Sequence, residues 1–442
     1  MRRSLLLLFL LGLLGLPSIP VWAHGTRSRH GVLKRPTRAH RFHPAAHREG
    51  RAPRFGTWGQ GAWSWFGDPR AVYVSGQYRE IFVGWLGWSG GVTVGAYDPR
   101  FGVLEEHVVG YMFHDDHSAP SIFVEPDKRL TVFWSAHNGS AMYYRSTLRP
   151  EDISAWGPLQ HVPRNVAGDF GFTYPNPILL PSENNKLYLF WRGGNWSEDF
   201  ATRRLDGLWS PAHELISVPG QRPYVKVDSN GRDQIALAFT DGHPRNVLSS
   251  IYYASYRSGS LWSASGRQIA RIADGPIAPW QADLIYNAQA TGVPAWVWDV
   301  AIDTHGRPVI VYATFPSYQR HDYWYADWTG SHWLSHFMTA GGGTISPGGI
   351  EYEYSGGITL DHNDPATVYL SRQVADGFEI ERWTTPDHGT HWHASVVVPA
   401  AGSENVRPVV PRGWDRGPMH LLWLHGDYGS YSQYRTWVDY LR

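Results

Sequence analysis

Hydrophobic and polar residues follow one arrangement seven times along this chain. An apolar run is followed by a short polar turn and a second apolar run, which ends in a polar or aromatic residue. The copies lie at residues 71–87, 121–137, 177–193, 224–242, 297–315, 357–372 and 408–426, the first being the most divergent. Short apolar runs bounded by turn residues predict β-strands, and two such runs joined by a DG- or NG-like turn predict a hairpin.

The spacing of the hairpins indicates how they assemble. Equivalent large residues recur every 48 to 73 residues, at Trp85, Trp134, Trp191, Phe239, Tyr312, Leu370 and Trp423. Repeats of this length, built from hairpins, are typical of β-propellers. We therefore predict an all-β fold, a seven-bladed β-propeller over residues 56–442. The stretch 56–67 is expected to supply the strand that closes the ring, and an insertion near 277–287 has room to overhang the central pocket.

The region before the predicted propeller has a different composition. Residues 1–23 contain two arginines, a leucine-rich run and a plausible cleavage point, which is typical of a secretory signal peptide. Residues 24–55 carry nine Lys and Arg, five His and one acidic residue, Glu49. Because hydrophobic periodicity is missing there, we expect a basic disordered tail that acts as a linker. The tail could also bind an anionic glycan, an envelope lipid or another polyanion.

Composition restricts the compartment and the chemistry. The chain has no cysteine, so disulfides and thiolate metal sites are excluded. No other apolar run approaches the length of a membrane span. We expect a secreted or periplasmic monomer with no membrane span and no nucleic-acid partner. The 23 Trp and 24 Tyr agree with sugar binding, although packing between blades also explains most of them.

Polar residues that a buried strand does not need recur at corresponding positions of the hairpins. One set stands at or before the first strand: His117, Tyr174, Arg222, Asp299, Tyr354 and Arg407. A second set stands at the end of the second strand: His137, Arg192, Asp241, His243, Arg372 and His425. Because the two strands of a hairpin are antiparallel, both sets should ring one mouth of the central channel. Uncompensated charges are costly in a dry core, which favours a binding or catalytic pocket.

Several of these segments resemble one known family. They are HDDHSAPSI from His114, SAHN from Ser135, FTYPNP from Phe172, FWRGGNW from Phe190, QRPYVK from Gln221 and DGHPR from Asp241. Together they are similar to the BNR-4 group of seven-bladed propellers, and the resemblance covers most of residues 57–440. That group includes ulvan lyases and enzymes that cleave rhamnosyl-glucuronate linkages in plant gums.

The resemblance implies a catalytic site made of a histidine pair, a tyrosine and an arginine on one propeller face. In this sequence those positions are His117, His137, Tyr174 and Arg192. The implied substrate is a uronate-containing polysaccharide or oligosaccharide. We expect the substrate-binding residues among Arg222, His243, Asp299, Tyr354, Arg372 and Arg407.

The chemistry of these residue types agrees with β-elimination across C4–C5 of a 4-linked uronate. Arg192, with or without Arg222, is suited to neutralise the carboxylate, which makes the C5 proton more acidic. Tyr174 or His137 could remove that proton, the tyrosine if a neighbouring cation lowers its pKa. Tyr174 or His117 could protonate the leaving oxygen.

Two other functions fit the same scaffold. A sialidase-like or rhamnosidase-like glycoside hydrolase is one; the sialidase type would grip a carboxylate with three arginines and use Tyr354 with Glu351 or Glu353 as nucleophile. A non-catalytic glycan-binding propeller is the other, and it would keep the aromatic residues and arginines without needing the histidines and Tyr174. The fold alone does not separate the three functions.

Metal binding is a further question. No cofactor is required by the sequence, although a structural calcium or zinc ion could bind. The run His114, Asp115, Asp116 and His117 offers nitrogen and oxygen ligands. Adjacent residues of a strand point to opposite faces, so the four side chains are not expected to reach one ion, and we place no metal in the site.

Overall fold

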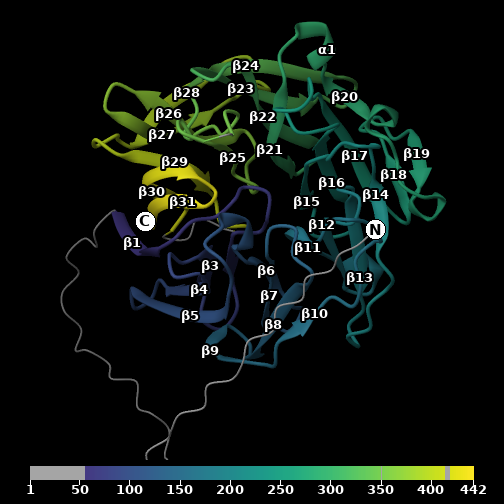
Figure 1. The fold of residues 1–442 in the computed structure, drawn as a ribbon, viewed down its shortest axis with the longest axis vertical. Coiled ribbons are helices and arrows are strands. Elements are labelled where there is room, and N and C mark those ends of the chain that lie inside the picture. The colour runs from purple at the N-terminus through teal and green to yellow at the C-terminus, as the bar shows by residue number, and fades with distance from the viewer. Residues whose placement is uncertain (1–54, 350, 414–418) are drawn as a thin grey trace, which may run out of the picture. The chain divides into compact units, whose positions relative to one another are not determined.

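The predicted hairpins form the inner strands of seven antiparallel sheets in the part of the chain that the computed structural model describes, residues 55–442 except 350 and 414–418. The sheets stand around a common centre like the blades of a propeller (Figure 1). The prediction of a seven-bladed β-propeller is thereby confirmed. The predicted signal peptide, 1–23, and the predicted basic tail, 24–55, lie outside the described residues except for Phe55.

Blades one to four follow the chain in order. Blade one consists of β2 (Ala71–Val74), β3 (Glu80–Leu86), β4 (Gly91–Asp98) and β5 (Val103–Tyr111). Blade two contains β6 (Ser121–Val124), β7 (Leu130–Ser135), β8 (Met142–Arg149), β9 (Asp152–Trp156) and β10 (Gln160–His161). Blade three contains β11 (Thr173–Leu180), β12 (Lys186–Arg192), β13 (Glu198–Arg203) and β14 (His213–Ile216). Blade four contains β15 (Val225–Ser229), β16 (Ile235–Thr240), β17 (Ile251–Arg257), β18 (Ser260–Trp262), β19 (Gln268–Arg271) and β20 (Asp283–Tyr286).

Blades five to seven complete the ring. Blade five contains β21 (Ala295–Ile302), β22 (Pro308–Ser317), β23 (Arg320–Trp328) and β24 (Trp333–Gly342). Blade six contains β25 (Ile358–Leu360), β26 (Thr367–Val374), β27 (Gly377–Thr384) and β28 (His393–Val398). Blade seven contains β29 (Glu404–Val409), β30 (Leu421–Ser430), β31 (Gln433–Leu441) and β1 (Phe55–Gln60). Five short helical turns lie between consecutive strands of the described chain: η1 (Asp116–Ser118), η2 (Pro181–Glu183), η3 (Ile272–Asp274), η4 (Pro279–Gln281) and α1 (Ala288–Thr291).

The ring is closed by strands from both ends of the described chain. β1 pairs with β31, with Gly56 opposite Tyr440 and Thr57 opposite Asp439. A side chain at Gly56 would not fit, because a Cβ atom there would lie 2.3 Å from the Tyr440 ring. The predicted closing strand is therefore confirmed, and the closure leaves no open gap between the first and last blades.

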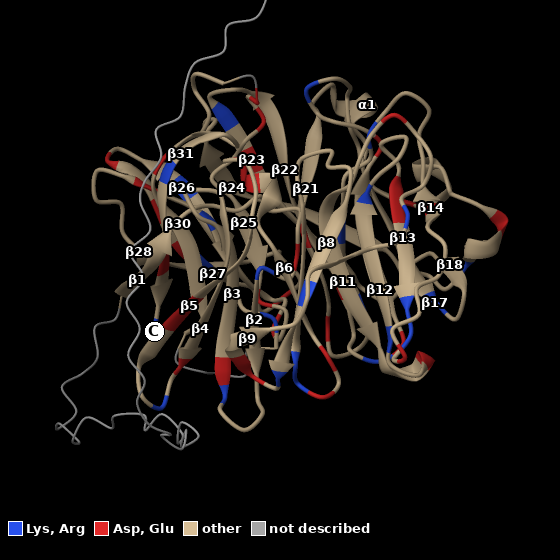
Figure 2. Ribbon diagram, turned by 60° about the horizontal axis from the view of Figure 1, so that its bottom comes forward, with Lys and Arg blue, Asp and Glu red and all other residues tan. Residues whose placement is uncertain are grey.

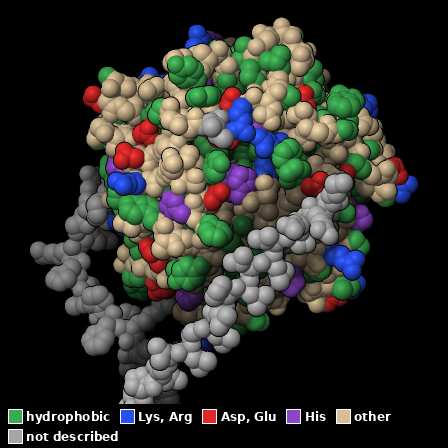
Figure 3. Space-filling model, viewed as in Figure 1, with side chains coloured by type: hydrophobic (Ala, Val, Ile, Leu, Met, Phe, Trp, Pro, Cys, Tyr) green, Lys and Arg blue, Asp and Glu red, His purple; other side chains and the backbone are tan. Residues whose placement is uncertain are grey.

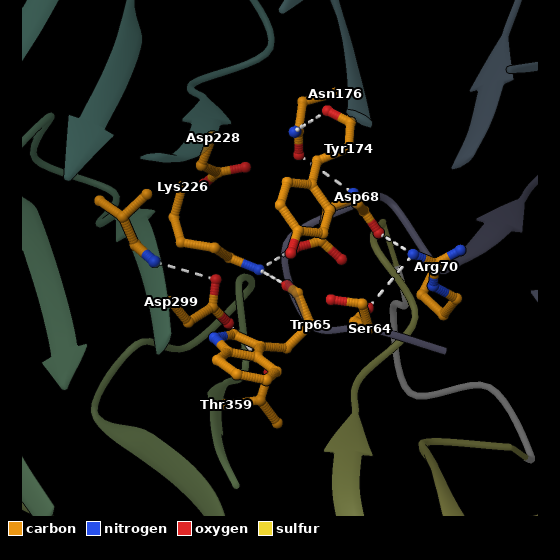
Figure 4. A network of polar contacts seen from close by, with 12 residues as sticks. Ser64, Trp65, Asp68, Arg70, Tyr174, Asn176, Lys226, Asp228, Asp299 and Thr359 are labelled. Carbon is orange, nitrogen blue, oxygen red and sulfur yellow. Dashed lines mark hydrogen bonds and ion pairs between the residues drawn. The ribbon is translucent and has the colours of Figure 1, made fainter. Parts of the chain in front are cut away.

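The residues after β1 plug the central channel, which the sequence did not indicate. Trp65 stacks on Trp298 of blade five at 4.4 Å, and Phe66 lies 4.8 Å from Tyr224, next to blade four. Lys226 of blade four donates to the Trp65 carbonyl and to Asp68 (Figure 4). Because this segment contacts inner strands of several blades, it turns an open channel into two separate mouths.

The predicted insertion does not overhang the centre. Its strand β20 pairs with β17, and the amide of Ile277 donates to the Leu215 carbonyl of β14 at 2.9 Å. The segment thus extends the outer edge of blade four, where strand pairing satisfies its backbone groups. Within the described residues no helix is long and apolar enough to cross a membrane. Acidic and basic residues are scattered over the blades, many of them at turns (Figure 2).

Candidate functional site

Tyr174 is presented to the centre by an irregularity of its own strand. The register of β11 against β12 shifts between Thr173 and Asn176, and Tyr174 has a φ of 61°. A left-handed conformation is strained for a bulky residue and persists only where its surroundings hold it. Here the side-chain Nδ2 of Asn176 donates to the Tyr174 backbone carbonyl at 2.9 Å, and its Oδ1 accepts from the backbone N–H of Asp68 at 3.0 Å (Figure 4). A bulge of this kind re-aims a side chain, and it directs the Tyr174 ring toward His117.

His117 and His137, the imidazole pair, come from the two ends of one hairpin. His117 lies in η1, just before β6, and His137 follows β7. Their rings are stacked, with centroids 3.9 Å apart and planes 6° from parallel. One carboxylate serves both rings: Asp115 Oδ1 lies 2.6 Å from His117 Nδ1, and Oδ2 lies 3.3 Å from His137 Nδ1. Asp115 also accepts from the His117 amide at 3.0 Å, which fixes the turn.

The two imidazoles have opposite pKa shifts. Burial alone would lower the pKa of His117, but the Asp115 and Asp116 carboxylates outweigh it and raise the pKa to about 9. Burial and the charge of His117 lower the pKa of His137 to about 4. Near neutral pH His117 is therefore a protonated imidazolium and His137 a neutral imidazole. An acid and a base are commonly paired in this way. The partnership with His117 in turn holds the pKa of Asp115 far below its usual range, although burial opposes this.

Arg192 lies against two tyrosine rings at the end of β12. Its guanidinium carbon is 4.9 Å from the Tyr174 ring centroid and 5.3 Å from that of Tyr224. One nitrogen donates to the Tyr224 hydroxyl at 2.9 Å, and another reaches Asn138 and Thr173 at 3.4 Å. The Nε atom is buried and has no hydrogen-bond partner among the described residues. The two 3.4 Å contacts are long, so the terminal nitrogens are the donors that a ligand could engage. Burial, with Tyr224 adding to it, raises the pKa of Tyr174 well above its ordinary value, so this phenol holds its proton.

Access to these groups is uneven. The His137 side chain is 27% exposed, whereas that of His117 is 4% exposed. Tyr431, in the turn between β30 and β31, stands edge-on to the imidazole pair, 5.0 Å from the His117 ring and 5.6 Å from the His137 ring. His137 is therefore the member of the pair that faces the mouth. On the face of the propeller shown in Figure 3, basic and histidine side chains gather in a central hollow beside hydrophobic ones.

Arg407 and Arg372 are held by acidic residues. Arg407 is 1% exposed and donates to Asp116 and to the Tyr428 hydroxyl, the latter at 2.7 Å. Arg372 donates to Glu381 at 2.9 Å and to Glu379 at 3.0 Å within its own blade. Neither guanidinium is thus free to grip a carboxylate, and the three-arginine grip of a sialidase-like hydrolase is not assembled.

The other predicted binding residues are divided between two places. His243 borders the site: its ring lies 5.4 Å from Tyr224, and its Nε2 is 3.2 Å from Glu351. Tyr354 is buried against the plug, 5.2 Å from Trp65. Asp299 faces away from this mouth and lies 3.0 Å from His362 Nε2, in the turn between β25 and β26. The structure therefore does not bring Asp299 together with the imidazole pair, because a register shift turns it into the interior network of Figure 4.

Among the described residues, one group could hold a metal ion: Asp115, His117 and His137, whose ligand atoms lie within 4.8 Å of one another. Both oxygens of that carboxylate already face imidazole nitrogens, so an ion would have to displace these contacts. The four neighbouring side chains considered from the sequence do not all meet: Asp115 and Asp116 both lie beside His117 Nδ1, at 2.6 and 3.3 Å, whereas His114 points elsewhere. His114 stacks on Tyr434 at 4.0 Å, and Asp116 pairs with Arg407.

Three residues of the site were missed by the sequence reasoning. Asp115 was considered only as a metal ligand, yet it joins the imidazole pair. Tyr224 stands two residues after Arg222 in the same QRPYVK segment, and this position could have drawn attention to it. Tyr431 comes from an outer-strand turn of the last blade, where the hairpin pattern carries no signal.

These features define a class of protein: a seven-bladed β-propeller with a cluster of ionisable side chains at one mouth of a plugged channel. The chain belongs to the BNR repeat-containing family, whose model matches residues 80–340. A search of curated proteins found no match.

Several solved propellers are similar to this chain. A PL25 ulvan lyase bound to -[GlcA(1-4)Rha3S]- shares 13% identity at a TM-score of 0.67, over 87% of this chain and 94% of that one. The polysaccharide lyase Uly1 shares 11% sequence identity at a TM-score of 0.56, over 90% of this chain and 94% of that one. The BP39L lectin from Burkholderia pseudomallei shares 11% sequence identity at a TM-score of 0.52, over 82% of this chain and 94% of that one. At such identities the similarity establishes the fold.

Proposed function

We propose that the protein is a polysaccharide lyase that cleaves uronate-containing glycans by β-elimination. The observation that carries this proposal is the imidazole pair on one aspartate, with Tyr174 5.1 Å from the His117 ring and Arg192 against the same tyrosine. The family membership and the similarity to a lyase bound to a glucuronate-containing glycan support the same reading.

The pKa shifts suggest how the roles divide. Neutral His137, the more exposed imidazole, accepts the C5 proton of the uronate. The electrons of that C–H bond form the C4–C5 double bond as the C4–O bond breaks. Tyr174, whose phenol keeps its proton, donates it to the departing oxygen. Solvent exchange then returns the proton from the imidazolium to the phenolate.

Arg192 makes the first step possible by its charge. The N–H groups of its terminal nitrogens hold the uronate carboxylate, which stabilises the negative charge that develops as C5 loses its proton. His117 stays protonated through Asp115 and Asp116, and its positive charge keeps the stacked His137 ring neutral before the reaction. In this scheme His117 is a positioning residue.

A glycan-binding propeller without catalysis is the second candidate. It is favoured by the burial of Tyr174 and Arg192, which are 7% and 2% exposed. Such a protein would bind the same glycans and release no product.

The test is to incubate the protein with a panel of uronate-containing polysaccharides and to follow ultraviolet absorbance and product mass. Unsaturated products support the lyase, saturated products that contain an added water support a hydrolase, and binding without products supports the second candidate. Tyr354→Phe serves as a discriminating control. Tyr354 is buried like Tyr174 and is the nucleophile of the hydrolase alternative, so a lyase keeps its activity in this variant.

A further inference from the structure

Arg222 stands in an aromatic stack on the side of blade four. Its guanidinium carbon lies 5.0 Å from the centroid of the Trp196 ring. The other neighbour of Trp196 is Phe170, stacked at 3.9 Å and 21°. Because Phe170 covers one face of the indole, Arg222 has the other face. Stacking on an aromatic ring holds a guanidinium flat while its edge remains open to hydrogen bonds.

Arg222 differs from the neighbouring arginines in its lack of partners. Arg192 donates to Tyr224, Arg245 donates to Glu351 at 2.6 Å, and Arg407 donates to Asp116. Arg222 makes no hydrogen bond or ion pair with any described residue. Its Nε is buried without an acceptor, as are those of Arg192 and Arg407, but in Arg222 the terminal nitrogens have no partner in the described part of the chain either. A guanidinium whose terminal donors have no acceptor within the protein can offer them to an acceptor that comes from outside the chain.

The stack is positioned by close backbone contacts. Trp196 lies in the tight turn after β12, where its amide donates to the Gly193 carbonyl at 2.8 Å and its φ is 63°. The Phe170 amide donates to the Gly194 carbonyl at 3.0 Å. A Cβ atom at Gly168 would lie 2.3 Å from the carbonyl carbon of Gly194, so the two segments approach as only glycine allows. The aromatic support of Arg222 is therefore formed in advance of binding.

The surroundings of Arg222 adjoin the proposed site and carry excess positive charge. Tyr224, two residues further along, accepts a hydrogen bond from Arg192. Beyond it, Glu351 is already bound by Arg245. Burial lowers the pKa of His243 to about 4, so this imidazole is neutral and adds no charge near neutral pH. Arg192 and Arg222 therefore remain as two cations, each of which can bind a separate anionic group of a ligand.

From this geometry we infer a second anionic subsite: Arg222, held flat by Trp196, binds a sulfate ester or carboxylate on a sugar next to the uronate that Arg192 holds. This inference rests on the proposed function, because it takes the ligand to be the same glycan. A planar pair of N–H groups matches two oxygens of either anion. The protein is thereby expected to prefer glycans that carry an acidic group on consecutive sugars.

The test is calorimetric binding in the Tyr174→Phe background, in which turnover is expected to be too slow to consume the probe during a titration. The probes are a sulfated uronate oligosaccharide, the same oligosaccharide after desulfation, and oligogalacturonate, which has a carboxylate on every sugar. Arg222→Gln should weaken binding of the sulfated probe, of oligogalacturonate, or of both by about tenfold to hundredfold, the value of a charged hydrogen-bonded contact. It should leave the desulfated probe within about twofold. Which of the two probes responds identifies the anion as sulfate or carboxylate.

Two further variants sharpen the result. Arg232→Gln is the matched control, because this arginine is 79% exposed in the turn between β15 and β16, at the opposite ends of the strands. It should change none of the affinities. Trp196→Leu should weaken the responding probe less than Arg222→Gln does, since the charge stays while its support is lost.

Equal weakening of all three probes, or of none, would overturn the subsite, as would a parent protein that binds none of them. A wild-type protein that shows the expected pattern of binding but releases no unsaturated product would overturn the lyase function and leave the subsite standing. The two proposals can therefore fail separately.

Discussion

Two buried clusters of the described chain, at opposite ends of the strands, join histidines to shared or paired aspartates, and they differ in which ring nitrogens remain unbound. At one mouth, Asp115 binds the Nδ1 atoms of the imidazole pair, and the Nε2 atoms make no hydrogen bond with any described residue. At the other, His362 lies 3.0 Å from Asp228 through one ring nitrogen and 3.0 Å from Asp299 through the other. Only the first cluster can exchange a proton without breaking its own contacts.

The second cluster is also balanced in charge. Arg412 pairs with Asp228 and Lys226 pairs with Asp68, and all four lie beside a cavity or in the channel wall beneath it. The cavity measures about 660 Å³, yet the charged groups at its floor are bound to one another. Residue types and burial are thus poor guides to function by themselves. The informative difference is whether donors and acceptors remain for a ligand.

The largest expected effect comes from removing the tyrosine hydroxyl group at the first cluster. Tyr174→Phe preserves the ring packing but removes the proton that the leaving oxygen needs, so kcat should fall about 10²–10⁴-fold. Steady-state rates of unsaturated product measure this, and thermal unfolding should show little change. Near-normal turnover in this variant would show that another group supplies the proton.

At the second cluster a substitution should affect stability and not turnover. His362→Ala leaves two buried aspartates with fewer partners, and we expect a loss of about 3–5 kcal/mol in the free energy of unfolding. Denaturant titration measures this, with kcat unchanged at a temperature where the variant is folded. His305→Ala, at a 73% exposed side chain, is the control that should leave stability unchanged. A drop in kcat for folded His362→Ala would contradict the division between the two mouths.

A smaller effect is expected when the charge at the first mouth is kept and its shape is changed. Arg192→Lys retains a cation but loses the planar donor set and the contact to Tyr224, so kcat/KM should fall about tenfold to hundredfold. Arg203→Lys, at an ion pair with Glu125 in the outer part of its blade, is the matched control. If both variants were equally active, Arg192 would not be the carboxylate partner.

The smallest effect is the pH dependence of the imidazole pair. Turnover needs neutral His137 and protonated His117, so activity should decline below about pH 4 and above about pH 9. For stability, the raised pKa of His117 favours the folded state below the ordinary value of 6.5, and this contribution is lost as the pH rises to about 9.

Unfolding midpoints measured from pH 6 to pH 10 test the stability term. The advantage of the wild type over His117→Gln should shrink across that window. The depressed pKa of His137 acts in the opposite sense, since stability should rise with pH between about 4 and 6.5. A constant difference between the two proteins would exclude a protonated His117 in the folded state.

Much of the architecture followed from local pattern. Seven hairpins, their order and the closing strand near residue 56 were predictable, because strand alternation and turn residues act over short distances. The matching ends of consecutive hairpins also predicted that His117, His137, Tyr174 and Arg192 would meet. Their contacts in the structure agree with that expectation, while their catalytic roles remain a proposal.

The hairpin pattern did not predict where a side chain points when the strand register shifts by one residue. Asp299 and Tyr174 occupy corresponding positions in their hairpins, but Tyr174 lies within its register shift whereas Asp299 ends its own, and Tyr174 is the one that turns toward the imidazole pair. Arg407 was predicted to bind substrate, yet a buried aspartate binds it. Which charges are neutralised depends on partners that are distant in sequence, and the hairpin pattern contains no information about them.

The sequence by itself determined the repeated strands, the ring that they close and the residue types gathered at its mouth, since these depend on hydrophobic periodicity and strand direction. The tertiary structure alone decided that Trp65 plugs the channel, that Asp115 joins the imidazole pair and that the Nε of Arg222 has no acceptor among the described residues. Those outcomes depend on contacts between segments that lie far apart in the chain, and they are settled only when all seven blades are packed.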